Sequence, residues 1–205
     1  FQNVKFLNST STDSTKYILY DQGLNDGSSS DNCTYLLYED GGKKKAILTK
    51  YRFNMNDRTD GTKLIVTVPE TVSVNGSEYT VTEIADGAFE NCDGINEISL
   101  PSSVKSIGDF AFSGCWNLFN IKFNENLKLI GNGAFSNCHS LNNVVIPNGL
   151  DKLGTSAFES CDSLTKVKLP DNIQVIPNNL FNGCGMLKNI SLPDGLKEIG
   201  KNSFA

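Results

Sequence analysis

The stretch KLIGNGAFSNCHSLNNVVIPNGL, residues 128–150, recurs with the same spacing through the second half of the chain. Five consecutive 23-residue units fill residues 82–196 without insertion or deletion, and a partial sixth unit covers residues 197–205. A fixed short period is the sequence signature of a solenoid, in which each unit forms one coil and packs against its neighbours. The units are numbered coil 1 (82–104), coil 2 (105–127), coil 3 (128–150), coil 4 (151–173) and coil 5 (174–196).

Each coil has apolar residues at the same positions. One column is aromatic, and it consists of Phe89, Phe112, Phe135, Phe158, Phe181 and Phe204. Apolar residues two apart, such as Ile98 and Leu100, indicate a short strand with one buried face, and a proline such as Pro101 ends it. The Ala-Phe-x-x-Cys segment favours one helical or 3₁₀ turn, and the glycine at Gly108 and its equivalents favours a tight bend. We therefore predict a β-rich solenoid of short, stacked parallel strands.

The shared pattern L-x-x-I-G-x-x-A-F-x-x-C-x-x-L-x-x-I-x-L-P resembles the leucine-rich repeats of the BspA-like, treponemal type. The resemblance covers residues 82–205 and reaches back to Leu64. The chain departs from the pattern at Asn124, where proline is usual, at Pro177, where glycine is usual, and at Leu180, where alanine is usual. The resemblance implies a bacterial or protozoan surface protein, secreted or attached to the cell, typically adhesive and without catalytic residues.

Residues 1–62 do not repeat, and their short apolar runs predict a β-rich cap that shields the first coil. The alternative is a separate ligand-binding domain, although about 60 residues scarcely bury a core of their own. Residues 63–205 are assigned to the solenoid, starting with a degenerate coil. Within that coil residues 70–81 are an insertion, and Asn75-Gly76 between alternating apolar residues predicts a β-hairpin.

The charge balance argues against nucleic acid as the main partner. Lys and Arg total 18 against 23 Asp and Glu, which gives a net charge of −5, whereas phosphate binding needs a basic field. No apolar run reaches the roughly 18 residues of a membrane-spanning helix. The chain opens at Phe1, and we expect that a signal peptide has been removed or that the chain has been trimmed.

Five of the six cysteines lie one period apart, at Cys92, Cys115, Cys138, Cys161 and Cys184, and Cys33 lies outside the repeat. The column allows three interpretations, namely metal ligands, disulfides or buried thiols. Stacked side chains point in parallel and converge neither on each other nor on a metal ion, so we favour buried thiols. We expect no metal and no cofactor.

Other candidate chemistry has a simpler explanation. His139, the single histidine, occupies a position that varies between coils and indicates an exposed turn, and no nucleophile motif accompanies it. Residues 56–61 bear a faint likeness to a calcium loop, but an Asx-rich turn explains them better. We therefore predict that the chain is not an enzyme.

The outward positions of the stacked strands predict a binding face. They form an Asn-rich strip with a basic cluster, and the candidate residues are Phe119, Asn120, Lys122, Asn143, Val145, Lys166, Lys168 and Lys188. The strip is either a ligand face or a solvated sheet face whose lysines deter aggregation. The first interpretation predicts a non-catalytic adhesion or protein-recognition module, with a protein or glycoprotein partner on a host or bacterial surface. The second fits a structural spacer that presents another domain.

The end of the repeat leads to one further expectation. Since residues 197–205 stop before the strand of their own coil, the strand around Ile190 has an open edge. We expect either that the natural chain continues or that a second molecule pairs with this edge.

Overall fold

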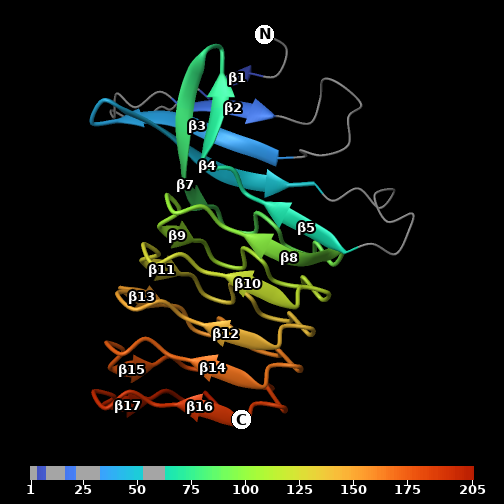
Figure 1. Ribbon diagram of the computed structural model, residues 1–205, viewed down its shortest axis with the longest axis vertical. Coiled ribbons are helices and arrows are strands. Elements are labelled where there is room, and N and C mark those ends of the chain that lie inside the picture. Colours follow the sequence, from blue (N-terminus) through green and yellow to red (C-terminus); the bar gives the residue numbers. More distant parts are fainter. Residues whose placement is uncertain (1–3, 8–16, 22–32, 53–62) are drawn as a thin grey trace.

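Stacked coils form an elongated solenoid in the computed structural model, which describes residues 4–7, 17–21, 33–52 and 63–205 (Figure 1). The front strands are β8 (Ile95–Ser99), β10 (Asn120–Lys122), β12 (Asn143–Val145), β14 (Lys166–Lys168) and β16 (Asn189–Ser191). The back strands are β9 (Ser106–Ile107), β11 (Leu129–Ile130), β13 (Lys152–Leu153), β15 (Val175–Ile176) and β17 (Glu198–Ile199). All pairing between these strands is parallel, so the predicted solenoid is confirmed.

The Ala-Phe-x-x-Cys segments form single hydrogen-bonded turns, and the described residues contain no helix. In coil 2 the amide of Cys115 donates to the carbonyl oxygen of Phe112 at 3.2 Å, which closes one turn. Gly114 then has a φ of 73°, in the left-handed region, so the turn cannot continue as a helix. The equivalent position is left-handed in the other full coils, at Asn91, Asn137, Ser160 and Gly183.

The aromatic column forms the centre of the core. Successive phenylalanine rings stack with centroids 4.8 to 5.9 Å apart from Phe89 to Phe204. Phe135 is fully buried, and it also meets the edge of Phe123 at 5.6 Å. A single coil could not bury these rings, so the stack of coils supplies the core.

The glycines of the back bend are needed for close approach between coils. A Cβ atom on Gly131 would lie 2.5 Å from the backbone carbonyl carbon of Gly108, one coil earlier. The same clash, at 2.3 Å, would occur between Gly154 and Gly131. The sequence analysis assigns these glycines to a tight bend. The structure shows that they are needed because the backbones of neighbouring coils leave no room for a Cβ atom.

The described part of residues 1–62 continues the back sheet. Its strands are β1 (Val4–Leu7), β2 (Tyr17–Asp21), β3 (Cys33–Asp40) and β4 (Lys43–Tyr51), paired antiparallel in that order. β4 pairs in parallel with β7 (Ser77–Ile84), and the amide of Tyr51 donates to the carbonyl oxygen of Ala88 at 2.7 Å. The Tyr51 ring stacks on Phe89 at 5.1 Å, as Phe89 stacks on Phe112. β4 thus takes the place of a coil, which supports the interpretation as a cap.

The degenerate coil that precedes coil 1 carries a hairpin. β5 (Leu64–Thr67) pairs with β8, and β6 (Thr71–Val74) pairs antiparallel with β7. Asn75 and Gly76 join β6 to β7 with φ values of 51° and 73°, both left-handed as a two-residue hairpin turn requires. The proposed Asx-rich turn at residues 56–61 lies outside the described residues.

The strand ladders are interrupted twice, which the even repeat does not predict. β13 and β15 belong to different sheets, and so do β10 and β12. In coils 1 to 4 the backbone amide of the residue after the back strand donates a hydrogen bond to a carbonyl oxygen of the preceding turn of the stack. In coil 4, for example, the amide of Gly154 donates to the carbonyl oxygen of Ile130 at 2.8 Å. Pro177 occupies this position in coil 5 and has no N–H group, which explains the gap between β13 and β15. At the break between β10 and β12, Phe123 stands where the other coils have leucine or isoleucine, and its ring meets that of Phe135 in the next coil at 5.6 Å. We infer that this larger side chain keeps the two strands from pairing.

Candidate binding face

Strand alternation places the predicted residues on the outer face of the front strands. In β12 the buried Val144 separates the exposed Asn143 and Val145, and in β14 the buried Val167 separates two exposed lysines. Lys122 and Lys188 are also exposed, whereas Phe119 and Asn120 are half-buried. All eight predicted residues therefore lie in or beside the front strands, and this surface is named the front face.

The front face is basic although the protein is acidic. The strand register sets Asn143 beside Lys166, and Val145 beside Lys168. Within the described chain, none of Lys122, Lys166, Lys168 and Lys188 forms an ion pair, so their charges are directed to solvent. Val145 is 62% exposed among them, an apolar side chain that the core does not use. The combination offers positive charge with a small apolar contact.

A shallow hollow of about 440 Å³ lies at the break between β10 and β12, where Phe119, Asn120, Ser140, Asn142 and Asn143 line it. In the neighbouring coils polar side chains at the Phe119 position join adjacent strands. Asn96 Oδ1 accepts from the amide of Leu64 at 2.9 Å, and Thr165 Oγ1 lies 2.9 Å from Asn142 Oδ1.

Phe119 cannot make such a bond, so it interrupts this polar ladder. Its ring lies below Lys63 Nζ, with 4.5 Å between the nitrogen and the ring centroid, a cation–π contact. The hollow thus combines an aromatic ring, amide groups and a nearby cation.

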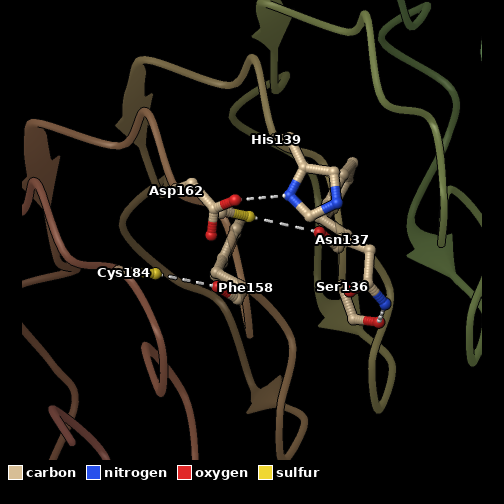
Figure 2. Close-up of polar contacts among 8 residues, drawn as sticks. Ser136, Asn137, His139, Phe158, Asp162 and Cys184 are labelled. Atoms are coloured by element: carbon tan, nitrogen blue, oxygen red, sulfur yellow. Dashed lines mark hydrogen bonds and ion pairs between the residues drawn. The ribbon is translucent and has the colours of Figure 1, made fainter.

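The single histidine lies on the turn beside the front face. Figure 2 shows His139 and Asp162 pointing toward each other, with 2.8 Å between Nδ1 and Oδ2, an ion-pair distance without hydrogen-bond geometry. The His139 ring is 6.0 Å from that of Trp116, which is 56% exposed. Ser136, nearby in Figure 2, accepts from Asn137 Nδ2 at 3.2 Å, and in the described chain no hydroxyl or thiol bonds to the imidazole. These residues do not form a catalytic triad.

The cysteine column lies in the core. The sulfurs of Cys115, Cys138, Cys161 and Cys184 are buried free thiols. Among the described residues no cluster of three or more His, Cys, Asp or Glu side chains could hold a metal ion. Within the same residues no helix has the length and apolar character needed to cross a membrane.

The sequence model of the BspA type leucine rich repeat region matches residues 80–205 in six copies. The chain belongs to this family. The BspA-type repeat thus covers the hollow and the front face from β8 onward, while β1 to β4 precede it. Among curated proteins there is no match.

Solved structures of bacterial leucine-rich repeat proteins share the fold. A protein from Bacteroides ovatus is 32% identical with a TM-score of 0.62, over 88% of this chain and 51% of that protein. A protein from T. pallidum is 30% identical with a TM-score of 0.55, over 76% and 78% of the two chains. A leucine rich cell surface protein from Faecalibacterium prausnitzii is 25% identical with a TM-score of 0.63, over 89% and 51%. The chain thus spans about half of the Bacteroides and Faecalibacterium proteins.

Sequence reasoning found part of the hollow. Phe119, Asn120 and Asn143 were predicted as face residues, and the structure brings them together. The prediction missed Ser140, and it placed Asn142 in the Asn-rich strip without choosing it as a candidate residue, because an unbroken stack would leave no hollow between their coils. It also missed Lys63, because nothing in the repeat places that residue over coil 2. The available signal was the aromatic residue at 119, in a column that is otherwise polar.

Proposed function

We propose that this BspA-type chain is a non-catalytic recognition module of a secreted or cell-surface protein. It binds a protein or glycoprotein on a host or bacterial surface through the front face. The family membership and the description of one relative as a cell surface protein support the location. The descriptions of the relatives reported above name no reaction.

One observation carries the proposal, namely the segregation of charge. A protein of net charge −5 keeps Lys122, Lys166, Lys168 and Lys188 together on the front face, unpaired within the described chain. Charge complementarity of this kind steers an acidic partner toward the face and fixes its orientation. The exposed Val145 at the centre supplies apolar area for the contact.

The test is charge reversal with a matched control. Immobilised wild-type chain, the Lys166→Glu/Lys168→Glu variant and a Lys105→Glu/Lys152→Glu control are exposed to solubilised host-surface and bacterial-surface glycoproteins. Lys152 is an exposed lysine of the back strand β13, and Lys105 is an exposed lysine just before β9, so the control changes net charge equally on the other sheet.

We expect the wild type and the control to retain a partner that the front-face variant loses, and added salt to weaken retention. A spacer would give the same result for all three chains. Equal retention by the front-face variant and the control would therefore contradict the proposal and favour the spacer.

A further inference from the structure

Coil 2 concentrates phenylalanine and tryptophan at positions that hold neither residue, nor tyrosine, in the other full coils. They are Phe110, Trp116, Phe119 and Phe123, and Trp116 is the only tryptophan of the chain. Trp116 is 56% exposed and Phe110 is 48% exposed, so these two do not serve the core. Aromatic groups held at the surface beside polar groups are typical of contact sites.

The hollow adjoins this aromatic coil. Ser140 lines the hollow, and its amide donates to the carbonyl oxygen of Trp116 at 3.1 Å. The turn that carries Trp116 therefore lies next to the part of the hollow that coil 3 forms. Phe119, three residues later, lines the hollow itself. One aromatic ring lies inside the hollow and a second lies on the turn beside it.

The amide groups of the hollow have hydrogen-bonding capacity left over. In the described chain, neither side-chain amide atom of Asn143 bonds to protein, and neither Asn142 Nδ2 nor Asn120 Oδ1 does so. A side-chain amide offers donors and an acceptor in one plane, which matches the hydroxyl groups of a sugar. The Phe119 ring offers the flat apolar surface on which the C–H face of a sugar ring can lie.

We propose that the hollow between β10 and β12 is a subsite for an anionic saccharide. The inference rests on the proposed function, because the subsite forms part of the front face. Its volume of about 440 Å³ lies within the range of small-molecule sites. Among the described residues three cations lie around it, namely Lys63 above Phe119, Lys122 on β10 and Lys166 beside Asn143, against one carboxylate, that of Glu97, which accepts from Asn120 Nδ2 at 3.4 Å. This excess of positive charge selects a carboxylate or sulfate on the saccharide.

A peptide strand does not fit the same gap. Cα atoms of β10 and β12 approach within 8 Å of one another. A strand paired with both of them would need about 9.6 Å, twice the usual spacing between paired strands. The hollow is also shallow and lacks the deep apolar pocket that anchors a peptide side chain, since four of its five lining residues carry an amide or a hydroxyl group.

The test is a titration of the isotope-labelled chain with saccharide probes, in which NMR records the chemical shifts of the backbone amides. The probes are a hyaluronan tetrasaccharide, which carries carboxylates, a chondroitin sulfate tetrasaccharide, which carries carboxylates and sulfates, and the neutral chitotetraose. We expect shifts at residues 119–122 and 140–145 with at least one anionic probe, and binding at least tenfold weaker with chitotetraose. Tighter binding of the hyaluronan probe would indicate that the subsite selects a carboxylate, and tighter binding of the chondroitin sulfate probe would indicate that it selects a sulfate.

Matched variants complete the test. Asn142→Ala/Asn143→Ala removes the free amide of Asn143 and the half-bonded amide of Asn142, and Asn189→Ala removes an exposed amide of β16 on the same face, outside the hollow. We expect the first variant to bind at least tenfold more weakly and the second to bind as the wild type does, with unchanged circular dichroism in both.

Shifts elsewhere, no binding of either anionic probe, or full binding by Asn142→Ala/Asn143→Ala would overturn the inference. If the partner capture still depended on Lys166 and Lys168, the proposed function would stand while the saccharide subsite failed. If a saccharide bound in the hollow but the Lys166→Glu/Lys168→Glu variant retained the partner as well as the wild type, the subsite would stand and the proposed function would fail.

Discussion

The thiol of Cys138 donates to the carbonyl oxygen of Phe112 at 3.2 Å, one coil earlier in the stack. The contact recurs along the column, at Cys115 with Phe89, Cys161 with Phe135 and Cys184 with Phe158. Each thiol thus adds a hydrogen bond to a peptide carbonyl of the aromatic column and fills a small volume beside it. Burial raises the pKa of the Cys138 thiol from its ordinary value of 9.0 to about 12.

The buried column should be chemically protected. Because a thiolate is the reactive form and Cys138 is fully buried and protonated, we expect it to react slowly with a thiol reagent at neutral pH. Denaturation should make the same residue react quickly. Mass spectrometry of the modified peptides checks both rates, and rapid modification of Cys138 in the folded chain would contradict the assignment to the core.

The raised pKa also predicts a loss of stability in alkali. Below pH 9.0 both states hold the Cys138 proton, and between there and about 12 only the folded state holds it. Unfolding then releases a proton, so this thiol's contribution to stability falls by up to ~1.4 kcal/mol per pH unit as pH rises. In urea denaturation, the stability difference between wild type and Cys138→Ala should shrink from about pH 8 to about pH 10. A constant difference would show that the folded-state pKa is ordinary.

The aromatic column predicts a gradient of mutational cost. Phe135 is fully buried between Phe112 at 5.1 Å and Phe158 at 5.3 Å, whereas Phe204 is 43% exposed in the last coil. Phe135→Ala should cost about 3–5 kcal/mol of unfolding free energy, through lost burial and a cavity. Phe204→Ala should cost clearly less. Equal losses in chemical denaturation would argue against a stacked column.

Most of the architecture was predictable because the repeat imposes the same packing on every coil. The period locates the Phe135 column, the strand around Val144 and the bend at Gly131 from sequence alone. The interruptions were not predictable in this way, since they arise at single positions that break the average. Pro177 removes one donor from the back ladder, and Phe123 lies at the break between two front strands, so the hollow occurs where the chain departs from the pattern.

The glycine bend gives a matched pair of substitutions. A Cβ on Gly131 would lie 2.5 Å from the backbone of Gly108, whereas a Cβ on Gly185 would meet nothing within 4 Å. Gly131→Ala should therefore cost about 1–3 kcal/mol, since backbone must shift to admit the methyl group. Gly185→Ala should be nearly neutral in the same denaturation experiment. A neutral result for Gly131→Ala would mean that the coils tolerate a wider spacing at the bend.

The broken front ladder predicts how fast the strands exchange their amide hydrogens. β14 pairs with β12 on one side and β16 on the other, whereas β12 and β16 each have one partner. An unbroken stack would have protected β12 as well as β14, and only β16, at the open edge expected from the sequence, would exchange quickly. With the break, amides of β12 should exchange faster than those of β14.

β16 should exchange fastest of the three strands. Val144 of β12 is buried at 1% exposure beneath coil 2, while Ile190 of β16 is only half-buried. Local opening therefore exposes less apolar surface at β16 and costs less free energy there. Hydrogen exchange on dilute, monomeric protein, averaged over each strand, checks the order β14 slowest, β12 intermediate and β16 fastest. Equal protection of β12 and β14 would show that β10 and β12 pair in solution, and the hollow between them would then be closed.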